Sequence, residues 1–219
     1  MVGLPARGKS YLSKAIIRYL NFLGCPSKLF NAGSLRRQQG LAGTDANFFD
    51  PNNSDAKAQR EKMAMECLDH LLTWMQEKTA ETGGCVLSIF DATNTTAARR
   101  QAVIDRCALE QERDPGLKLL FVESMTNDEG LLAHNYRMKL SNEDYKGKDP
   151  TVALADFTRR VKQYESVYES VSEERDGDTT SFIKIVDAGR KLISNNVQGR
   201  IQRKVLQLMG SVHLGPRTT

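Results

Sequence analysis

The sequence predicts an α/β fold in which a mostly parallel sheet carries helices on both faces. Three observations lead to this prediction. First, a glycine-rich loop at residues 3–10 is followed directly by an amphipathic helix. Second, residues 85–90 and 117–122 are continuous apolar runs, as in strands that are buried on both faces. Third, predicted helices alternate with predicted strands along the chain. Such alternation is typical of parallel strands connected by helices.

Residues 3–10 read GLPARGKS, a phosphate-binding loop of the pattern G-x-x-x-x-G-K-[ST]. Gly3 and Gly8 let the backbone curl until its N–H groups point at a polyphosphate, and Lys9 reaches the β and γ oxygens. Ser10 offers its hydroxyl to Mg²⁺. The loop therefore predicts a P-loop NTPase-like fold that binds a nucleotide.

The segments on either side of the loop belong to the same motif. Apolar residues recur at helical spacing between residues 11 and 23, so the positive end of that helix faces the bound anion. The motif also requires a buried strand in front of the loop, and only Met1 and Val2 are available for it. We interpret the chain as a fragment that begins inside its first strand.

The remaining helices and strands are predicted from the spacing of apolar residues and from the glycines and prolines that end each segment. Helices are predicted at residues 55–79, 97–111, 151–168 and 196–209, with one more before a loop at residues 140–150, and strands at residues 28–32, 85–90, 117–122 and 182–186. Residues 40–54 predict a structured loop anchored by Phe48 and Phe49. Ligands of such sheets bind beyond the carboxyl ends of the strands, so we expect one shared rim. The rim comprises residues 3–10, 31–33, 91–96 and 123–128.

Composition limits the class of protein. The chain has 219 residues, of which 40% are hydrophobic and 26% charged, as in one globular domain with a full core. No segment reaches membrane-spanning length and no signal-peptide pattern occurs, so we predict a cytoplasmic protein without a membrane partner. The four cysteines show no C-x-x-C pairing and are predicted to be reduced core residues. They are Cys25, Cys67, Cys85 and Cys107.

Charge indicates the kind of partner. The formal net charge of +4 suits an anion. Basic residues occur singly or in pairs, without the aromatic interleaving of single-strand binders, which favours a phosphorylated metabolite over nucleic acid. A kinase whose acceptor already carries a phosphate needs extra cations, and arginine forks suit that task. The candidates are Arg36, Arg37, Arg60, Arg99 and Arg160, with Lys139 as a second lysine that stabilises transferring charge.

Asp91 follows the apolar run CVLSIF and has the setting of a Walker B carboxylate. The strand would aim it at the Mg²⁺ that Ser10 also contacts. The alternative is an N-cap of the next helix. Residues 93–96 add hydroxyls and an amide, which either bind a substrate hydroxyl or cap that helix.

Arg160 and Tyr164 are four residues apart in a predicted helix, so both can reach one ligand. Tyr164 also belongs to an apolar stripe with Phe157 and Val161. That stripe favours a core position for the tyrosine over a binding role.

Several segments together resemble one family. They read GLPARGKSYL, FNAG..RR, NFFDP, IFDATNTT, ESMTND, DF..R...YE and VDAGRKL..N.VQGRIQ, and in this order they resemble the kinase domain of 6-phosphofructo-2-kinase/fructose-2,6-bisphosphatase along essentially the whole chain. The resemblance implies transfer of the γ-phosphate of ATP, with Mg²⁺, to the 2-hydroxyl of fructose 6-phosphate. The product would be fructose 2,6-bisphosphate, a regulator of glycolysis.

The resemblance also implies roles for matched residues. Those for ATP are Gly3, Leu4, Pro5, Ala6, Arg7, Gly8, Lys9, Ser10, Tyr11 and Asn135. Those for the sugar phosphate are Arg36, Arg60, Thr93, Arg99, Lys139, Arg160 and Tyr164. For Tyr164 the resemblance therefore favours a binding role over the core position that the apolar stripe favoured. The implied catalytic residues are Lys9, Asp91 and Lys139, and the implied Mg²⁺ ligands are Ser10 and Asp91.

Two departures from the family pattern stand out. Thr126 occupies a position where many members have a cysteine, and the stretch from Asn135 to Lys139 is one residue shorter than usual. The C-terminal residues VHLGPRTT end where the family's phosphatase domain begins. We therefore expect residues 1–219 to form one kinase domain, linked to a phosphatase domain in the full-length protein and homodimeric by resemblance.

Two alternatives remain open at this point. One is a catalytically silent nucleotide-binding module that regulates or dimerises an attached bisphosphatase. The other is a different P-loop kinase of small substrates or of polynucleotide 5′ ends, for which strong salt dependence is expected.

Overall fold

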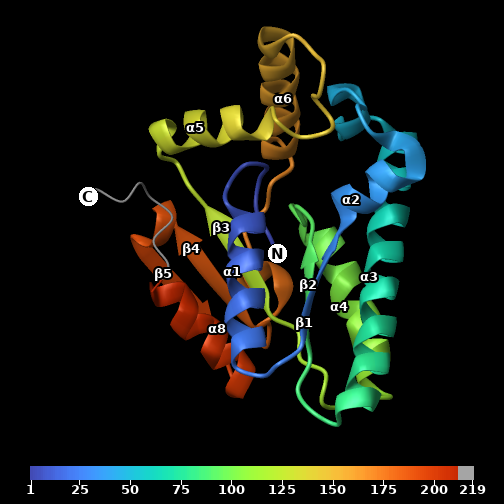
Figure 1. Ribbon diagram of the computed structural model, residues 1–219, viewed down its shortest axis with the longest axis vertical. Coiled ribbons are helices and arrows are strands. Elements are labelled where there is room, and N and C mark those ends of the chain that lie inside the picture. The colour runs from blue at the N-terminus through green and yellow to red at the C-terminus, as the bar shows by residue number, and fades with distance from the viewer. Residues whose placement is uncertain (212–219) are drawn as a thin grey trace.

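Five strands lie at the centre of the computed structural model, which describes residues 1–211 (Figure 1). They are β1 (Ser27–Asn31), β2 (Leu87–Asp91), β3 (Phe121–Met125), β4 (Phe182–Val186) and β5 (Lys191–Asn195). The C-terminal residues that we related to the start of a phosphatase domain, 212–219, lie outside the described residues.

Helices connect these strands. The longer ones are α1 (Lys9–Phe22), α3 (Ser54–Thr82), α4 (Ala97–Gln111), α5 (Glu129–Lys139), α6 (Pro150–Glu165) and α8 (Arg200–Ser211). The short ones are α2 (Ala32–Arg36), η1 (Arg37–Leu41), η2 (Ala46–Phe49), α7 (Glu173–Asp176) and η3 (Asp187–Gly189). Among the helices of residues 1–211, none is both long and apolar enough to cross a bilayer.

The strands form a pair, β1-β2, and a three-stranded sheet, β3-β4-β5, and their pairing is mostly parallel, which confirms the predicted fold class. β1 pairs with β2 and β3 pairs with β4 in parallel, and β5 is antiparallel to β4. Met1 and Val2 lie between β2 and β3: the Met1 ammonium donates to the Phe90 carbonyl and the Val2 N–H to the Val122 carbonyl, both at 2.8 Å. The segment in front of the phosphate loop therefore lies between the two sets of strands and connects them.

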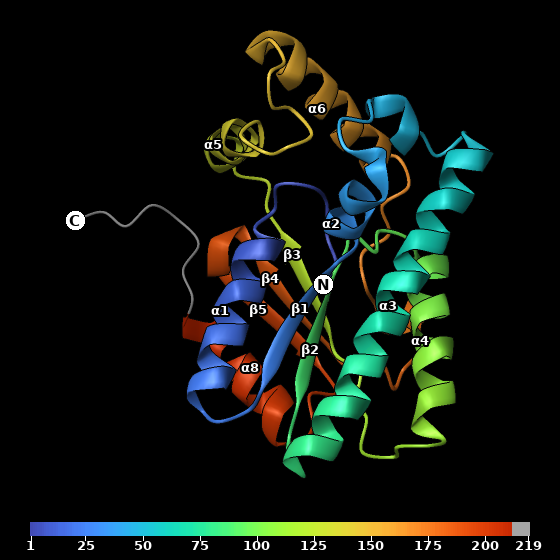
Figure 2. The same ribbon diagram turned by 45° about the vertical axis from the view of Figure 1, so that its right-hand side comes forward.

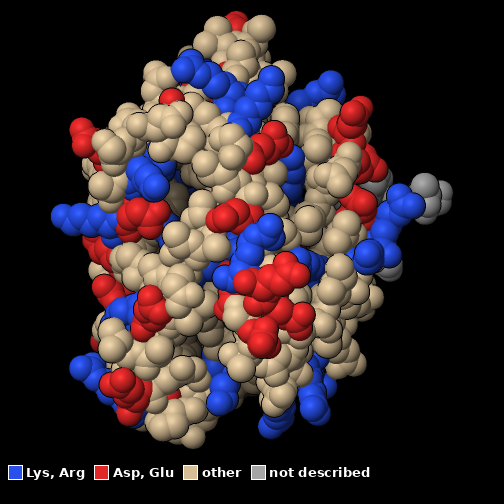
Figure 3. Space-filling view, turned by 180° about the vertical axis from the view of Figure 1, so that it is seen from behind, with Lys and Arg blue, Asp and Glu red and all other residues tan. Residues whose placement is uncertain are grey.

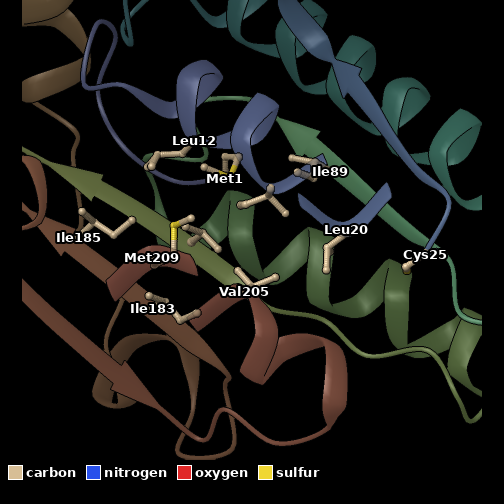
Figure 4. Packing of buried hydrophobic residues seen from close by; sticks show 11 residues of the cluster. Met1, Leu12, Leu20, Cys25, Ile89, Ile183, Ile185, Val205 and Met209 are labelled. Atoms are coloured by element: carbon tan, nitrogen blue, oxygen red, sulfur yellow. The ribbon is translucent and has the colours of Figure 1, made fainter. Parts of the chain in front are cut away.

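Helices cover both faces of the sheet, as predicted (Figure 2). α1 and α8 pack on one face with Ile89 and Ile183, whereas α3 and α4 pack on the other face with Phe90. Ile89 and Phe90 are neighbours in β2 and point in opposite directions because strand side chains alternate. Figure 4 shows Leu12 of α1 and Met209 of α8 among the side chains gathered over the first face.

Strand β3 begins at Phe121, so the predicted start at Leu117 is wrong. Side-chain amides satisfy the preceding peptide groups in place of a neighbouring strand. Gln111 of α4 donates to the Leu117 carbonyl at 2.9 Å, and Gln202 of α8 donates to the Leu119 carbonyl at 3.3 Å. The apolar run at residues 117–122 thus indicated burial, but not that its first residues pair with a neighbouring strand.

Strand β5 was not predicted, and α8 begins at Arg200 instead of residue 196. The side chains of β5 are mostly exposed, so the strand has no apolar run. The chain turns from β4 into β5 through η3, where Asp187 and Ala188 have φ of 46° and 58°. Helix α7 has only four residues, too few for a periodic signal.

The cysteine prediction is right for three residues and wrong for one. Cys25, Cys67 and Cys107 are buried and free, whereas Cys85 is free and exposed. Cys85 precedes β2, and its Sγ lies 3.1 Å from the Sγ of Cys25, which precedes β1.

Candidate active site

A cavity of about 720 Å³ opens beyond the carboxyl ends of β1 and β2. Its walls come from the phosphate loop, the segments after these two strands, α3, and the two helices α5 and α6 that stand at this end of the sheet in Figure 1. The predicted site residues that line it are Pro5, Ala6, Gly8, Lys9, Ser10, Tyr11, Arg36, Arg60, Asp91, Thr93, Arg99, Asn135, Lys139, Arg160 and Tyr164. Residues predicted to bind ATP and residues predicted to bind the sugar phosphate thus line one cavity.

Three predicted site residues are absent from this lining: Gly3, Leu4 and Arg7. Gly3 has a φ of +133°, and a Cβ there would overlap the carbonyl oxygen of Ser124, so close packing on β3 requires glycine. The Ser124 hydroxyl donates to the carbonyl of Arg7. Ser124 therefore supports the phosphate loop, and residues 123–128 do not line the cavity, contrary to the prediction of one shared rim.

The Arg7 side chain ties the phosphate loop to two helices. Its guanidinium donates to the Tyr136 hydroxyl of α5 at 3.0 Å and to Glu165 of α6 at 3.1 Å. Neither Tyr136 nor Glu165 lines the cavity. Arg7 thus connects the nucleotide side of the site with the helices that carry its other side.

Lys9 is buried at the start of α1, where Nζ donates to the Leu4 carbonyl at 2.6 Å. Burial lowers the pKa of Lys9 from 10.5 to about 7, with Asp91 acting in the opposite direction and Lys139 adding to the decrease. Bringing an anion close favours the charged form of a lysine. A polyphosphate in the loop would therefore restore the charge of Lys9.

Asp91 is 3% exposed and accepts two hydrogen bonds on the same oxygen, Oδ2. The Ser10 hydroxyl donates at 2.9 Å and the Asn31 amide at 2.8 Å. Asn31 reaches it because Asn31 and Asp91 are register partners at the ends of β1 and β2. The strand pairing thus holds the carboxylate beside the phosphate loop.

The N-cap alternative for Asp91 is wrong, because Thr96 caps α4 by accepting from the Arg99 N–H at 3.2 Å. The loop between Asp91 and Thr96 is held from behind by Arg100, which is fully buried. Arg100 donates to the Asn94 carbonyl at 3.2 Å and to Asp176 at 2.6 and 3.0 Å.

Arg36 is buried, and Asp144 is its main partner. Nη2 of Arg36 donates to the two carboxylate oxygens of Asp144 at 2.7 and 2.6 Å. The predictions did not include Asp144. It lies in the polar loop between α5 and α6, where no periodicity or motif marks it, and it is 108 residues from Arg36.

Arg160 and Tyr164 meet at the ring of Phe49. The Arg160 Cζ lies 3.6 Å from the ring centroid of Phe49, and the Tyr164 ring lies 6.0 Å from it. Tyr164 lines the cavity and is half-buried, whereas Phe157 and Val161 of the same stripe are buried. This position accords with the binding role that the resemblance implied.

Arg60 and Arg99 reach the cavity from α3 and α4. Arg60 donates to the Phe48 carbonyl and Arg99 donates to Glu61. Burial lowers the pKa of Arg60. Within residues 1–211, the remaining guanidinium nitrogens of both arginines have no hydrogen-bond partner, so they can bind an anion.

Asn135 and Lys139 lie one helical turn apart in α5 and both line the cavity. The Asn135 amide donates to the Ala6 carbonyl of the phosphate loop at 3.0 Å. Burial and the charge of Arg160 lower the pKa of Lys139. The shortened stretch therefore brings both residues to the site, while Thr126 lies outside the cavity lining.

Comparisons with known proteins point to one family. The profile described as 6-phosphofructo-2-kinase matches residues 1–215. A probable 6-phosphofructo-2-kinase of Schizosaccharomyces pombe is 40% identical over 218 residues, which are 99% of this chain and 31% of that protein. 6-phosphofructo-2-kinase 1 of Saccharomyces cerevisiae is 39% identical over 221 residues, covering 99% of this chain and 25% of that protein.

A human relative carries a longer name. 6-phosphofructo-2-kinase/fructose-2,6-bisphosphatase 3 of Homo sapiens is 37% identical over 219 residues, which are 100% of this chain and 40% of that protein. The chain thus spans between 25% and 40% of the length of these three relatives.

Proposed function

Because the chain belongs to the 6-phosphofructo-2-kinase family, we propose that it transfers the γ-phosphate of ATP to the 2-hydroxyl of fructose 6-phosphate, yielding fructose 2,6-bisphosphate. One observation carries the proposal: the phosphate loop and an arginine cluster line the same cavity. The cluster comprises Arg36, Arg60, Arg99 and Arg160. A kinase with a phosphorylated acceptor needs both anion sites within reach of each other.

The nucleotide side fits ATP with Mg²⁺. Ser10 and Asp91 provide two hard oxygen donors 2.9 Å apart, the ligand type that Mg²⁺ takes. Residues 1–211 contain no cluster of three or more His, Cys, Asp or Glu side chains suited to a metal, and Mg²⁺ in kinases takes only one or two protein carboxylates. When bound, Mg²⁺ neutralises phosphate charge.

The acceptor side would hold the sugar phosphate. Within residues 1–211, Arg60, Arg99 and Arg160 have guanidinium nitrogens without a hydrogen-bond partner, which would receive the 6-phosphate, and Thr93 has a hydroxyl for the sugar. Lys9 and Lys139 both line the cavity and would stabilise the charge of the group in transfer. Phosphoryl transfer depends mainly on such positioning and positive charge, so it does not need a strong base.

Two alternatives remain to be separated from this function. A silent regulatory module would bind ATP in the same loop without turnover. A polynucleotide kinase would need a continuous basic track, and the face shown in Figure 3, the rear of the molecule relative to Figure 1, has no such track in its described part, because basic and acidic side chains are intermixed there. The charge distribution therefore favours the small acceptor.

Three further expectations extend the proposal. The name of the human relative supports a covalently linked fructose-2,6-bisphosphatase domain in the full-length protein. A homodimer and a cytoplasmic location stay predictions.

The function is tested with purified protein, Mg-ATP and fructose 6-phosphate in a coupled assay of ADP release. We expect turnover with fructose 6-phosphate but not with fructose, and a product that returns to fructose 6-phosphate in mild acid. ATP binding without turnover would support the silent module instead. Competition by oligonucleotides would support the polynucleotide kinase.

A further inference from the structure

The loop between α5 and α6 places one buried carboxylate, Asp144, against the arginine side of the cavity. We infer that Asp144 is a positioning residue, which holds the guanidinium groups of Arg36 and Arg160 so that the acceptor phosphate is received in one orientation. This inference rests on the proposed function, because it concerns the acceptor side of that same site.

Asp144 is the common partner of three arginines. Its two oxygens accept from Nη2 of Arg36 at 2.7 and 2.6 Å, and Oδ2 lies 3.6 Å from Nη1 of Arg160 and 3.8 Å from Nη1 of Arg37. The Gly43 N–H also donates to Oδ1 at 3.3 Å. The carboxylate thus joins α2, η1 and α6 at one point.

Arg36 is almost fully engaged by the protein itself. Nη1 donates to Thr44 Oγ1 at 2.7 Å and to the Leu41 carbonyl, and both Nη2 bonds go to Asp144. A guanidinium has five N–H donors, so only the Nε–H of Arg36 is left for a ligand. Arg36 therefore mainly builds the wall of the site.

Arg160 is held but keeps free donors. Its Cζ lies 3.6 Å from the Phe49 ring centroid, and its Nη1 lies 3.6 Å from Oδ2 of Asp144. Its Nε is buried and has no hydrogen-bond partner within the described residues. Arg160 is thus oriented by Asp144 and Phe49 and can offer its remaining N–H groups to a phosphate.

The charge of Asp144 also matters. Burial acts to raise the pKa of Asp144, but the hydrogen bonds and charge of Arg36 outweigh it and hold that pKa below its ordinary value. The ionised carboxylate offsets the repulsion among neighbouring cations. Without it, Arg36, Arg37, Arg160 and Lys139 would face one another and turn apart.

Asp144 makes no hydrogen bond or ion pair to the phosphate loop within residues 1–211. Its loss should therefore affect the acceptor and spare the nucleotide. We expect Asp144→Asn to raise the KM for fructose 6-phosphate by about tenfold or more, while the KM for ATP stays within about twofold. A residue that only supports folding would not produce this split.

Glu143→Gln is the matched control. It removes the same charge from the neighbouring residue, whose side chain is 76% exposed and lies 3.4 Å from Arg37. We expect both KM values of Glu143→Gln to stay within about twofold of the unsubstituted protein. An unchanged or lower KM for fructose 6-phosphate in folded Asp144→Asn would overturn the inference.

A calorimetric titration with inorganic phosphate separates this inference from the proposed function. If the protein shows no turnover, the proposed kinase function is wrong. Weaker phosphate binding by Asp144→Asn than by the unsubstituted protein would still support the positioning role of Asp144. Equal or tighter binding by the variant overturns it, as does an unsubstituted protein that binds no phosphate.

Should Asp144→Asn fail to fold, Asp144→Glu provides the second test. It keeps the charge and moves the carboxylate by one methylene. A raised KM for fructose 6-phosphate with an unchanged KM for ATP supports the inference. Two unchanged KM values overturn it, because the position of the carboxylate would then not matter.

Discussion

The Ser10 hydroxyl donates a 2.9 Å hydrogen bond to the carboxylate of Asp91, 81 residues further along the chain. Asn31 donates to the same oxygen, because β1 and β2 pair in register up to Asn31 and Asp91. The bond joins the first helix to the end of a central strand. It places a carboxylate at the mouth of the phosphate loop, where a metal–nucleotide is expected.

Replacing Asp91 by Asn should lower kcat by about 10²-fold or more and raise the Mg²⁺ concentration needed for half-maximal rate. The amide keeps the shape but removes the charge that would hold the metal. Steady-state rates at varied Mg²⁺ measure this. Asp105→Asn on the exposed face of α4 is the control, and an Asp91→Asn protein with an unchanged Mg²⁺ requirement would rule out the metal role.

Lys9→Met should reduce transfer by about 10³-fold or more, because it removes the cation that the phosphate loop brings to the β and γ oxygens. ADP release at saturating substrates measures the effect. Lys62→Met, an exposed change on α3, should leave the rate unaltered. Substantial turnover by Lys9→Met would contradict the assignment of the phosphate loop.

Arg160→Leu should raise the KM for fructose 6-phosphate by about tenfold or more and change the KM for ATP much less. The reason is that Arg160 lines the cavity with its guanidinium held between Phe49 and Asp144. Arg159→Leu is a close control, since Arg159 is exposed and donates to Asn47 at 2.6 Å. Comparable effects of Arg160→Leu on both KM values would remove Arg160 from the acceptor site.

The rate should fall at alkaline pH as Lys139 loses its proton. Burial and Arg160 lower its pKa from 10.5, Arg37 acts in the same direction, and Asp91 and Asp144 oppose them. If the charged form is needed, kcat/KM for fructose 6-phosphate declines as pH rises through that lowered pKa. Lys139→Arg should move the decline to higher pH, because arginine stays protonated; an unmoved decline would exclude Lys139 as its cause.

Arg100→Met should destabilise the fold by about 3–5 kcal/mol, because it leaves the buried carboxylate of Asp176 without its partner. The side chains of the pair are 0% and 1% exposed. Urea unfolding measures the loss, with Arg113→Met, an exposed change, as control. The double change Arg100→Met with Asp176→Leu should recover part of the stability; a neutral Arg100→Met would show that the pair contributes little.

Local sequence signals predicted the elements that carry a strong pattern. Helix α4 and strand β4 have the predicted bounds, because a 15-residue amphipathic segment and a buried apolar run are each visible in the chain itself. Strand β5 and helix α7 were missed because an exposed edge strand and a single helical turn have no comparable pattern. The start of β3 was misplaced because burial alone does not reveal whether a peptide group bonds to a strand or to a side-chain amide.

The sequence by itself determined the phosphate loop and the acid at the end of β2, since eight consecutive residues and one strand end define them. Charge and position made the arginines candidates and the resemblance implied their roles, but their partners came only from the tertiary structure. Asp144 meets Arg36 across 108 residues and Glu61 meets Arg99 across 38. Such pairs leave no trace in local periodicity, because the charge that a side chain faces is decided by which segments the folded sheet and helices bring together.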